Sequence, residues 1–110
     1  MADVVLVLIG LNMYCYRGGT QVLVHGITAV KSACKGRNVA VISGNREFKL
    51  VVQTVAHELG HALGASHDGT GTSKMCSPNA RHLMAPFLVL KRKSTFSWCS
   101  IKVIDAFVVK

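Results

Sequence analysis

The sequence predicts an α+β fold, because strand-like segments fill the first part of the chain and segments with helical periodicity follow them. Up to about residue 45, short runs rich in β-branched residues alternate with glycine-containing turns. From Phe48 onward, apolar residues recur at the spacing of a helix. The 110 residues, 50% of them hydrophobic, are enough for one domain and too apolar for an intrinsically disordered chain.

The first expected strand is Val4–Ile9, in which every residue is apolar, as is typical of a central strand buried on both faces. The longer apolar run Val4–Leu11 is far shorter than the roughly 20 residues of a membrane span. No basic residue precedes it and no small-residue cleavage site follows it, so we expect neither a membrane span nor a signal peptide. Further strands are expected at residues 21–24, 26–30 and 39–42, with turns at residues 17–20 and 35–38.

Two helices are expected after the strands. The first covers about residues 48–63, where Val52, Val55 and Leu59 share one face, and Gly64 follows it at the position where helices commonly end. The second runs from about Ser97 to Val108. Between them, residues 64–94 show no periodicity and contain the only two prolines, so this segment is expected to be irregular.

The charge of the chain does not by itself identify a partner. Thirteen Lys and Arg residues against five Asp and Glu residues give a net charge of +8, which suits a nucleic-acid ligand, an anionic surface or a secreted protein equally. The densest basic cluster, Lys91-Arg92-Lys93, is a short run of the kind expected in a solvated surface loop, and it has no interleaved aromatic residues for base stacking. We therefore expect no nucleic-acid partner, and weak contact with anionic glycans stays open.

The residues that indicate chemistry lie between positions 57 and 68, where three of the five histidines fall. On a helix, His57 and His61 are one turn apart on the same face, so their imidazoles can bind one zinc ion. Gly64 lets the chain turn sharply and bring His67 back to the same ion. Three histidine ligands with a fourth position open to water are typical of a catalytic zinc site.

Glu58, next to the first histidine, has the chemistry of a general base. A zinc-bound water loses its proton near pH 7, and a carboxylate within reach can take that proton and pass it to a leaving amine. The pattern therefore indicates peptide-bond hydrolysis without a covalent intermediate. The pattern fixes five positions, namely His57, Glu58, His61, Gly64 and His67, and the probability that a chain of this length matches them by chance is on the order of 10⁻⁵–10⁻⁴. The alternative interpretation is a group of hydrogen-bonded core histidines with no metal. Apart from Asp68, the sequence near the motif offers no carboxylate to accept hydrogen bonds from the ligand histidines. Backbone carbonyls are therefore expected to orient the histidine rings.

The extended motif resembles the signature of the metzincin zinc peptidases, and Asp68 after the third histidine resembles the reprolysin (adamalysin) branch with its snake-venom, tick salivary and ADAM-type proteases. The resemblance continues in the edge segment Gly26–Cys34, in Arg81–Pro86, which is similar to the family's Met-turn, and in Phe96–Ser100 at the start of the last helix. It covers nearly the whole chain.

The resemblance implies a role for each matching residue. His57, His61 and His67 would bind one catalytic Zn²⁺, and Glu58 would be the general base. Met84 would form an apolar floor beneath the metal, and Asp68 would hold the turn after His67. The segment Gly26–Ala33 would be the edge strand that pairs with an extended protein or peptide substrate.

The four cysteines contain no C-x-x-C pair, and from the sequence alone they allow two disulfides in any of three connectivities. The resemblance implies a Cys76–Cys99 disulfide. Cys34 lacks its usual family partner, so Cys15 is either a substitute partner for Cys34 or a second free thiol, and of these we expect the Cys15–Cys34 bridge.

A reprolysin catalytic domain is about twice the size of this chain. The resemblance therefore implies that residues 1–110 form one partial metzincin catalytic domain without its N-terminal half, of an extracellular protein. In such a fragment, Val4–Ile9 would expose apolar surface. The expected function is a zinc endopeptidase, and the alternative is a non-catalytic zinc-binding module.

Overall fold

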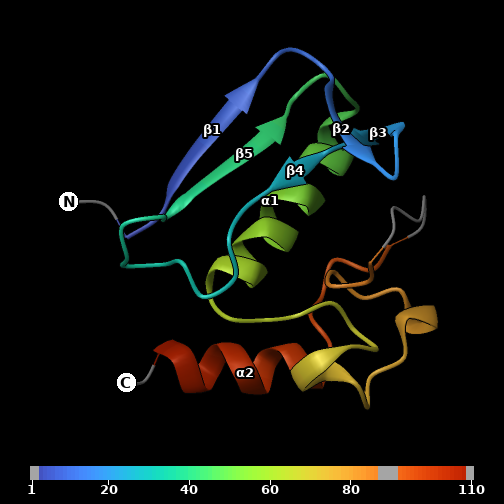
Figure 1. Ribbon diagram of the computed structural model, residues 1–110. Helices are drawn as coiled ribbons and strands as arrows, with labels where there is room; N and C mark the ends of the chain where they lie inside the picture. The colour runs from blue at the N-terminus through green and yellow to red at the C-terminus, as the bar shows by residue number, and fades with distance from the viewer. Residues whose placement is uncertain (1–2, 87–91, 109–110) are drawn as a thin grey trace.

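The α+β fold predicted from the sequence is confirmed in a computed structural model of the protein, which describes residues 3–86 and 92–108 (Figure 1). The strands are β1 (Val5–Ile9), β2 (Met13–Arg17), β3 (Thr20–Val24), β4 (Gly26–Ile27) and β5 (Val39–Ser43). The helices are α1 (Phe48–Ala62) and α2 (Trp98–Val108), with short 3₁₀ turns at Gly71–Ser73 and Pro78–Ala80 between them.

Three strands form a mixed sheet in the order β1-β5-β4. Strand β1 pairs in parallel with β5, from Val5 opposite Val39 to Ile9 opposite Ser43, and β4 pairs antiparallel with β5. Helix α1 crosses one face of this sheet (Figure 1). Ala40 and Ile42 of β5 pack there with Val51, and with Val55 at the margin, to form the core.

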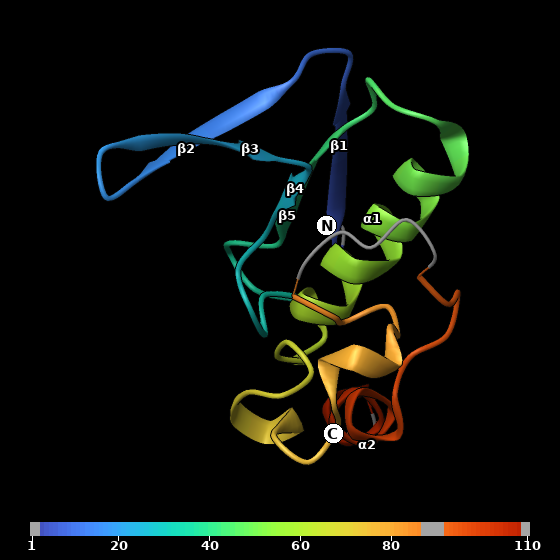
Figure 2. The ribbon, with the colours of Figure 1, turned by 90° about the vertical axis from the view of Figure 1, so that its right-hand side faces the viewer.

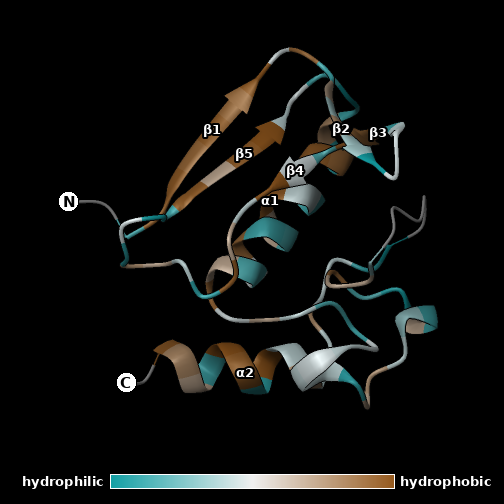
Figure 3. Cartoon of the chain, viewed as in Figure 1, coloured by the Kyte–Doolittle hydropathy of each residue, from teal (hydrophilic) through white to brown (hydrophobic). Residues whose placement is uncertain are grey.

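The prediction that Val4–Ile9 is a central strand is wrong for the described sheet, because β5 occupies the centre and β1 lies at the edge. Among the described residues, no element fully covers the apolar side chains of β1, and Leu8 is 58% exposed. The apolar exposure expected for this segment is therefore confirmed, and Figure 3 shows β1 as a continuous hydrophobic strand at the outside of the fold.

Strands β2 and β3 form a separate antiparallel hairpin that projects from the sheet (Figure 2). The turn predicted at residues 17–20 closes this hairpin, but the sequence analysis missed β2 itself. The strand expected at residues 26–30 is shorter than predicted and ends at Ile27. Among the described residues, no helix combines the length and the apolar character needed to cross a bilayer.

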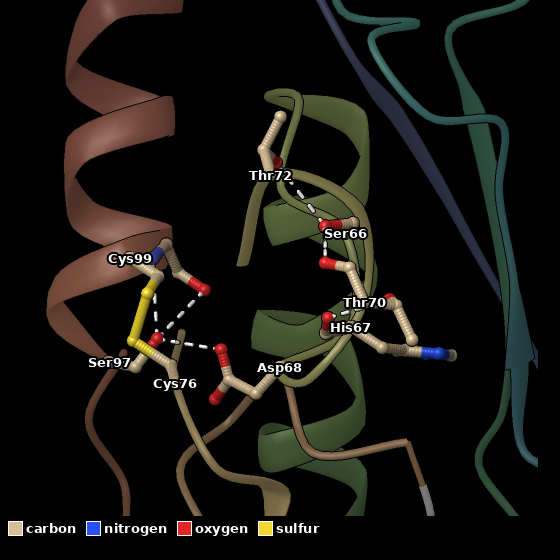
Figure 4. Close-up of a disulfide and its surroundings, with 9 residues drawn as sticks. Ser66, His67, Asp68, Thr70, Thr72, Cys76, Ser97 and Cys99 are labelled. Carbon is tan, nitrogen blue, oxygen red and sulfur yellow. Dashed lines mark hydrogen bonds between the residues drawn. A yellow bond between two sulfur atoms is a disulfide. The ribbon is translucent and has the colours of Figure 1, made fainter. Parts of the chain in front are cut away.

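The irregular segment between the two helices is fastened to α2. A disulfide joins Cys76 to Cys99 in the first turn of α2, which confirms the expected bridge (Figure 4). Figures 1 and 2 both show this segment and α2 below the C-terminal end of α1, on the side away from the sheet. This arrangement places residues 64–86 close to the last turns of α1.

Candidate metal centre

Helix α1 and the turn after it bring three imidazoles together. His57 and His61 are four residues apart on α1. The helix ends in a Schellman motif, in which Gly64 N–H donates to the carbonyl of His61 and Ala65 N–H donates to the carbonyl of Gly60. Gly64 has a φ of 104°, a conformation that suits glycine, and it redirects the chain so that His67 faces the helix again.

The three imidazoles have the spacing of ligands for one metal ion. Nε2 of His67 lies 3.2 Å from Nε2 of His57 and 3.1 Å from Nε2 of His61. A zinc ion at about 2.0–2.1 Å from each nitrogen in tetrahedral geometry would hold the nitrogens about 3.3 Å apart. The ligand atoms of all three residues lie within 4.8 Å of one another, so the group could hold a metal ion.

Backbone carbonyls orient two of these rings. Nδ1 of His57 lies 2.5 Å from the carbonyl oxygen of Leu83, and Nδ1 of His61 lies 2.8 Å from the carbonyl oxygen of Ala65. Each Nδ1 donates to its carbonyl oxygen only when it carries the proton of the neutral ring. In that tautomer Nε2 has a lone pair, which is directed at the centre of the cluster. The expectation that carbonyls rather than carboxylates would orient the rings is confirmed for this pair.

The environment of the cluster favours neutral imidazoles, the form that binds a metal. Burial lowers the pKa of His57 to about 3, with smaller effects in the same direction from His61, Arg92 and His67 and an opposing effect from the hydrogen bond to Leu83. Burial is also the main cause that lowers the pKa values of His61 and His67.

The Glu58 carboxyl group lies on the sheet side of α1, against β4. Burial raises the pKa of Glu58 to about 7. The close approach depends on Gly26, because a Cβ built there would lie 2.8 Å from Cγ of Glu58. The sequence analysis placed Gly26 in the edge segment but did not recognise this contact.

Asp68 and Met84 connect the turn after His67 to the rest of the fold. The carboxylate of Asp68 is almost fully buried, and its Oδ1 accepts a hydrogen bond of 2.7 Å from Oγ of Ser97 (Figure 4). The backbone N–H of Asp68 donates to the carbonyl of Met84. Met84 is fully buried, and its sulfur lies against the Cα of Gly60 on α1.

Arg92 is a component of this region that the sequence analysis placed on the surface. Its side chain is only 7% exposed, and the guanidinium donates to the carbonyl oxygens of Leu83 at 2.6 Å and Ala85 at 3.2 Å. Its Nη1 also lies 3.0 Å from Nδ1 of His57. Arg92 therefore contributes no charge to a basic surface cluster with Lys93, and Lys91 lies outside the described residues.

The bridge between Cys15 and Cys34 is not present, and both cysteines are free thiols. Cys34 lies near the start of β1, where its thiol donates to Oδ1 of Asp3, whereas Cys15 is in β2, beyond the other end of β1. The expected Cys15–Cys34 bridge is therefore wrong for this structure, and the alternative of two free thiols holds.

A groove of about 510 Å³ opens along the histidine cluster. One side is formed by α1 residues that include Thr54, His57 and Glu58, and the other by β3, the β4 segment and Arg17 of the hairpin. A buried metal-ligand cluster, a carboxyl group and an edge strand thus border one open space.

Comparison with known proteins places this arrangement in a family. Residues 12–110 match the family described as Reprolysin (M12B) family zinc metalloprotease. The chain belongs to the reprolysin family. It is similar to the hemorrhagic metalloproteinase-disintegrin-like kaouthiagin of Naja kaouthia, with 35% identity over 94% of this chain and 23% of the relative.

Reprolysin relatives with other domain compositions match as well. The chain is 37% identical to a disintegrin and metalloproteinase with thrombospondin motifs 13 of Homo sapiens, over 76% of this chain and 6% of the relative. A second relative, a disintegrin and metalloproteinase with thrombospondin motifs 7 of Mus musculus, is 33% identical over 76% of this chain and 5% of the relative. The chain thus spans less than a quarter of the length of each of these relatives.

Proposed function

We propose that this chain is a zinc-dependent endopeptidase in which His57, His61 and His67 bind one zinc ion and Glu58 acts as the general base. The observation that carries the proposal is the convergence of three Nε2 atoms whose spacing fits one zinc ion, beside a buried carboxyl group.

The cluster fits zinc better than it fits a metal-free core. Two rings direct lone pairs at the same small space, because their Nδ1 protons are engaged by Leu83 and Ala65. Without a cation, such lone pairs repel one another, and a proton on Nε2 of His67 could be shared with only one of them at a time. A bound zinc ion supplies Lewis acidity toward the scissile carbonyl and lowers the pKa of an attached water to about 7.

Glu58 would hold and move the proton. The carboxyl group is largely removed from water, and this raises its pKa to about 7, the range in which a group accepts and returns a proton near neutral pH. We assign Glu58 the uptake of the proton from the attacking water and its delivery to the leaving amine.

Substrate would bind along β4. Within the described sheet, β4 pairs with β5 on one side only, so its other edge can take an extended peptide strand. Gly26 keeps this strand close to Glu58. We assign Met84 the apolar floor beneath the metal and Asp68 the support of the turn after His67.

The alternative function is a non-catalytic zinc-binding module. The observation that favours it is the exposed apolar face of β1. A sheet that is incompletely covered can hold its other edge strand, β4, too loosely to position a substrate. For either function we propose an extracellular location, because disulfides such as Cys76–Cys99 persist in oxidising compartments.

The test compares the oxidised chain with its Glu58→Gln variant. Zinc affinity is measured by competition with a chromogenic chelator, and cleavage is measured on a fluorogenic peptide library with zinc added. We expect equal zinc affinity and a loss of cleavage of about 10²–10⁴-fold in Glu58→Gln. Zinc binding with the same background cleavage from both proteins would favour the module, and absence of zinc binding would refute both functions.

A further inference from the structure

The groove beside the histidines has a biased charge. Arg17 and Arg92 both line it, and Glu58 is the one carboxyl group among the lining residues that the structure describes. The proposed zinc ion would add further positive charge. Clefts lined by one sign of charge concentrate ligands of the opposite sign.

Arg17 is the cation that a ligand can reach. It is exposed at the end of β2, where the hairpin turns, and within the described part of the chain its side chain has no hydrogen bond or ion pair. It lines the same groove as His57, His61 and His67. A peptide in the groove can therefore place a carboxylate side chain against Arg17 while the peptide backbone lies near the histidines.

The opposite wall adds a background of positive charge. Arg92 is occupied by the carbonyls of Leu83 and Ala85, so it acts through its field rather than by contact. Arg46 lies behind Thr54, where its Nη2 donates to the Thr54 hydroxyl and to the carbonyl of Leu50. Arg46 is thereby held against Thr54, which lines the groove together with His25 and Arg92.

We propose that this groove selects peptide substrates with an aspartate or glutamate side chain flanking the scissile bond, and that Arg17 is the residue that contacts this side chain. The inference rests on the proposed function and specifies its substrate class. An arginine can bind a carboxylate with two parallel hydrogen bonds, and the surrounding cations oppose a basic side chain at the same position.

The test uses three peptides that differ only in a Glu, Gln or Lys residue next to the cleaved bond. We expect kcat/KM to fall in that order, with a difference of roughly tenfold between Glu and Lys at low salt that shrinks as salt is added. The variant Arg17→Glu should abolish the preference for the Glu peptide over the Gln peptide, and Arg17→Gln should reduce it.

Arg37→Glu is the matched control, because Arg37 is exposed and outside the groove and its replacement changes the net charge by the same amount. It should keep the preference. Equal kcat/KM for all three peptides, or the same loss of preference in Arg17→Glu and Arg37→Glu, would overturn the inference while leaving the peptidase intact.

Binding separates this inference from the proposed function. Dissociation constants of the three peptides are measured by fluorescence anisotropy with the zinc-loaded Glu58→Gln variant, in which they are not cleaved. Tighter binding of the Glu peptide that requires Arg17 supports the selectivity even if the wild-type chain cleaves nothing, which would refute the peptidase alone. Equal binding of all three peptides overturns the selectivity whatever the cleavage shows.

Discussion

The Cα of Gly60 lies directly against the sulfur of Met84, so closely that a Cβ built on Gly60 would be 2.5 Å from Sδ. Gly60 lies on α1 between the two helical histidines, and Met84 lies in the segment whose carbonyls contact His57 and Asp68. This contact sets the distance between the helix that carries two proposed ligands and the segment that supports them.

Gly60→Ala is therefore expected to destabilise the protein, although alanine normally favours a helix over glycine. The added methyl group must displace Met84 or the ring of Phe96, whose Cε1 would lie 3.0 Å away. We expect the free energy of unfolding in urea to fall by about 1–3 kcal/mol, and zinc affinity to fall with it. Gly36→Ala is the control, because no atom lies within 4 Å of its added Cβ. An unchanged or higher stability of Gly60→Ala would show that the segment can move away without cost.

Periodicity and motif spacing predicted the parts of the site that are local in sequence. Residues 48–63 were expected to be helical and α1 spans Phe48–Ala62, but the side chains that pack against β5 are Val51 and Val55, whereas Val52 of the expected face is 48% exposed. The left-handed turn at Gly64 also follows from the spacing of His61 and His67, since a continued helix would carry His67 away.

Features that depend on distant parts of the chain could not be predicted in this way. An all-apolar strand such as β1 indicates burial but does not reveal how many strands lie on each side of it. Arg92 was assigned to the surface because a short basic run is typically solvated, whereas its partners are carbonyls of a turn seven to nine residues away. Strand β2 could have been found, because two glycines between strand-like runs are a hairpin signal.

The cysteine assignment predicts two reactive thiols in the oxidised, unfolded chain. Titration with a thiol reagent in denaturant, without reductant, should give two thiols, from Cys15 and Cys34. A count of zero would contradict the structure.

Replacing Cys76 and Cys99 together by serine should lower the free energy of unfolding by ~3 kcal/mol, since the bridge closes a loop with a sequence separation of 23. The paired control, Cys15→Ser with Cys34→Ser, should change stability little.

Replacing Arg92 should weaken both the fold and metal binding. Arg92→Met keeps the length of the side chain but leaves the carbonyls of Leu83 and Ala85 without their charged donor. We expect the free energy of unfolding to fall by about 2–4 kcal/mol, and zinc affinity to fall roughly 10–100-fold because the Leu83 carbonyl also orients His57. Lys93→Met, at the exposed next position, is the control and should change neither quantity. Normal zinc affinity in Arg92→Met would show that His57 is oriented without it.

The raised pKa of Glu58 predicts a stability cost at alkaline pH in the metal-free protein. Because the folded state holds the Glu58 proton up to about pH 7, while an unfolded glutamic acid releases it near the ordinary value of 4.5, the folded chain binds more protons in this interval. The stability that Glu58 contributes is therefore fully present below pH 4.5 and is lost as the pH rises through 7. Glu58→Gln, which cannot ionise, should escape this loss and be more stable than the wild-type chain at pH 8 by about 1–3 kcal/mol, with a much smaller difference at pH 4.5.

The three histidines change stability in the opposite sense. Their lowered pKa values make them bind fewer protons when folded, so their contribution is lost as the pH falls below 6.5. This term is common to both proteins and cancels in the difference between wild type and Glu58→Gln. Urea unfolding of both proteins in chelator, at several pH values between 4.5 and 8, measures that difference. A difference that does not change with pH would mean that the Glu58 carboxyl group remains hydrated in the groove.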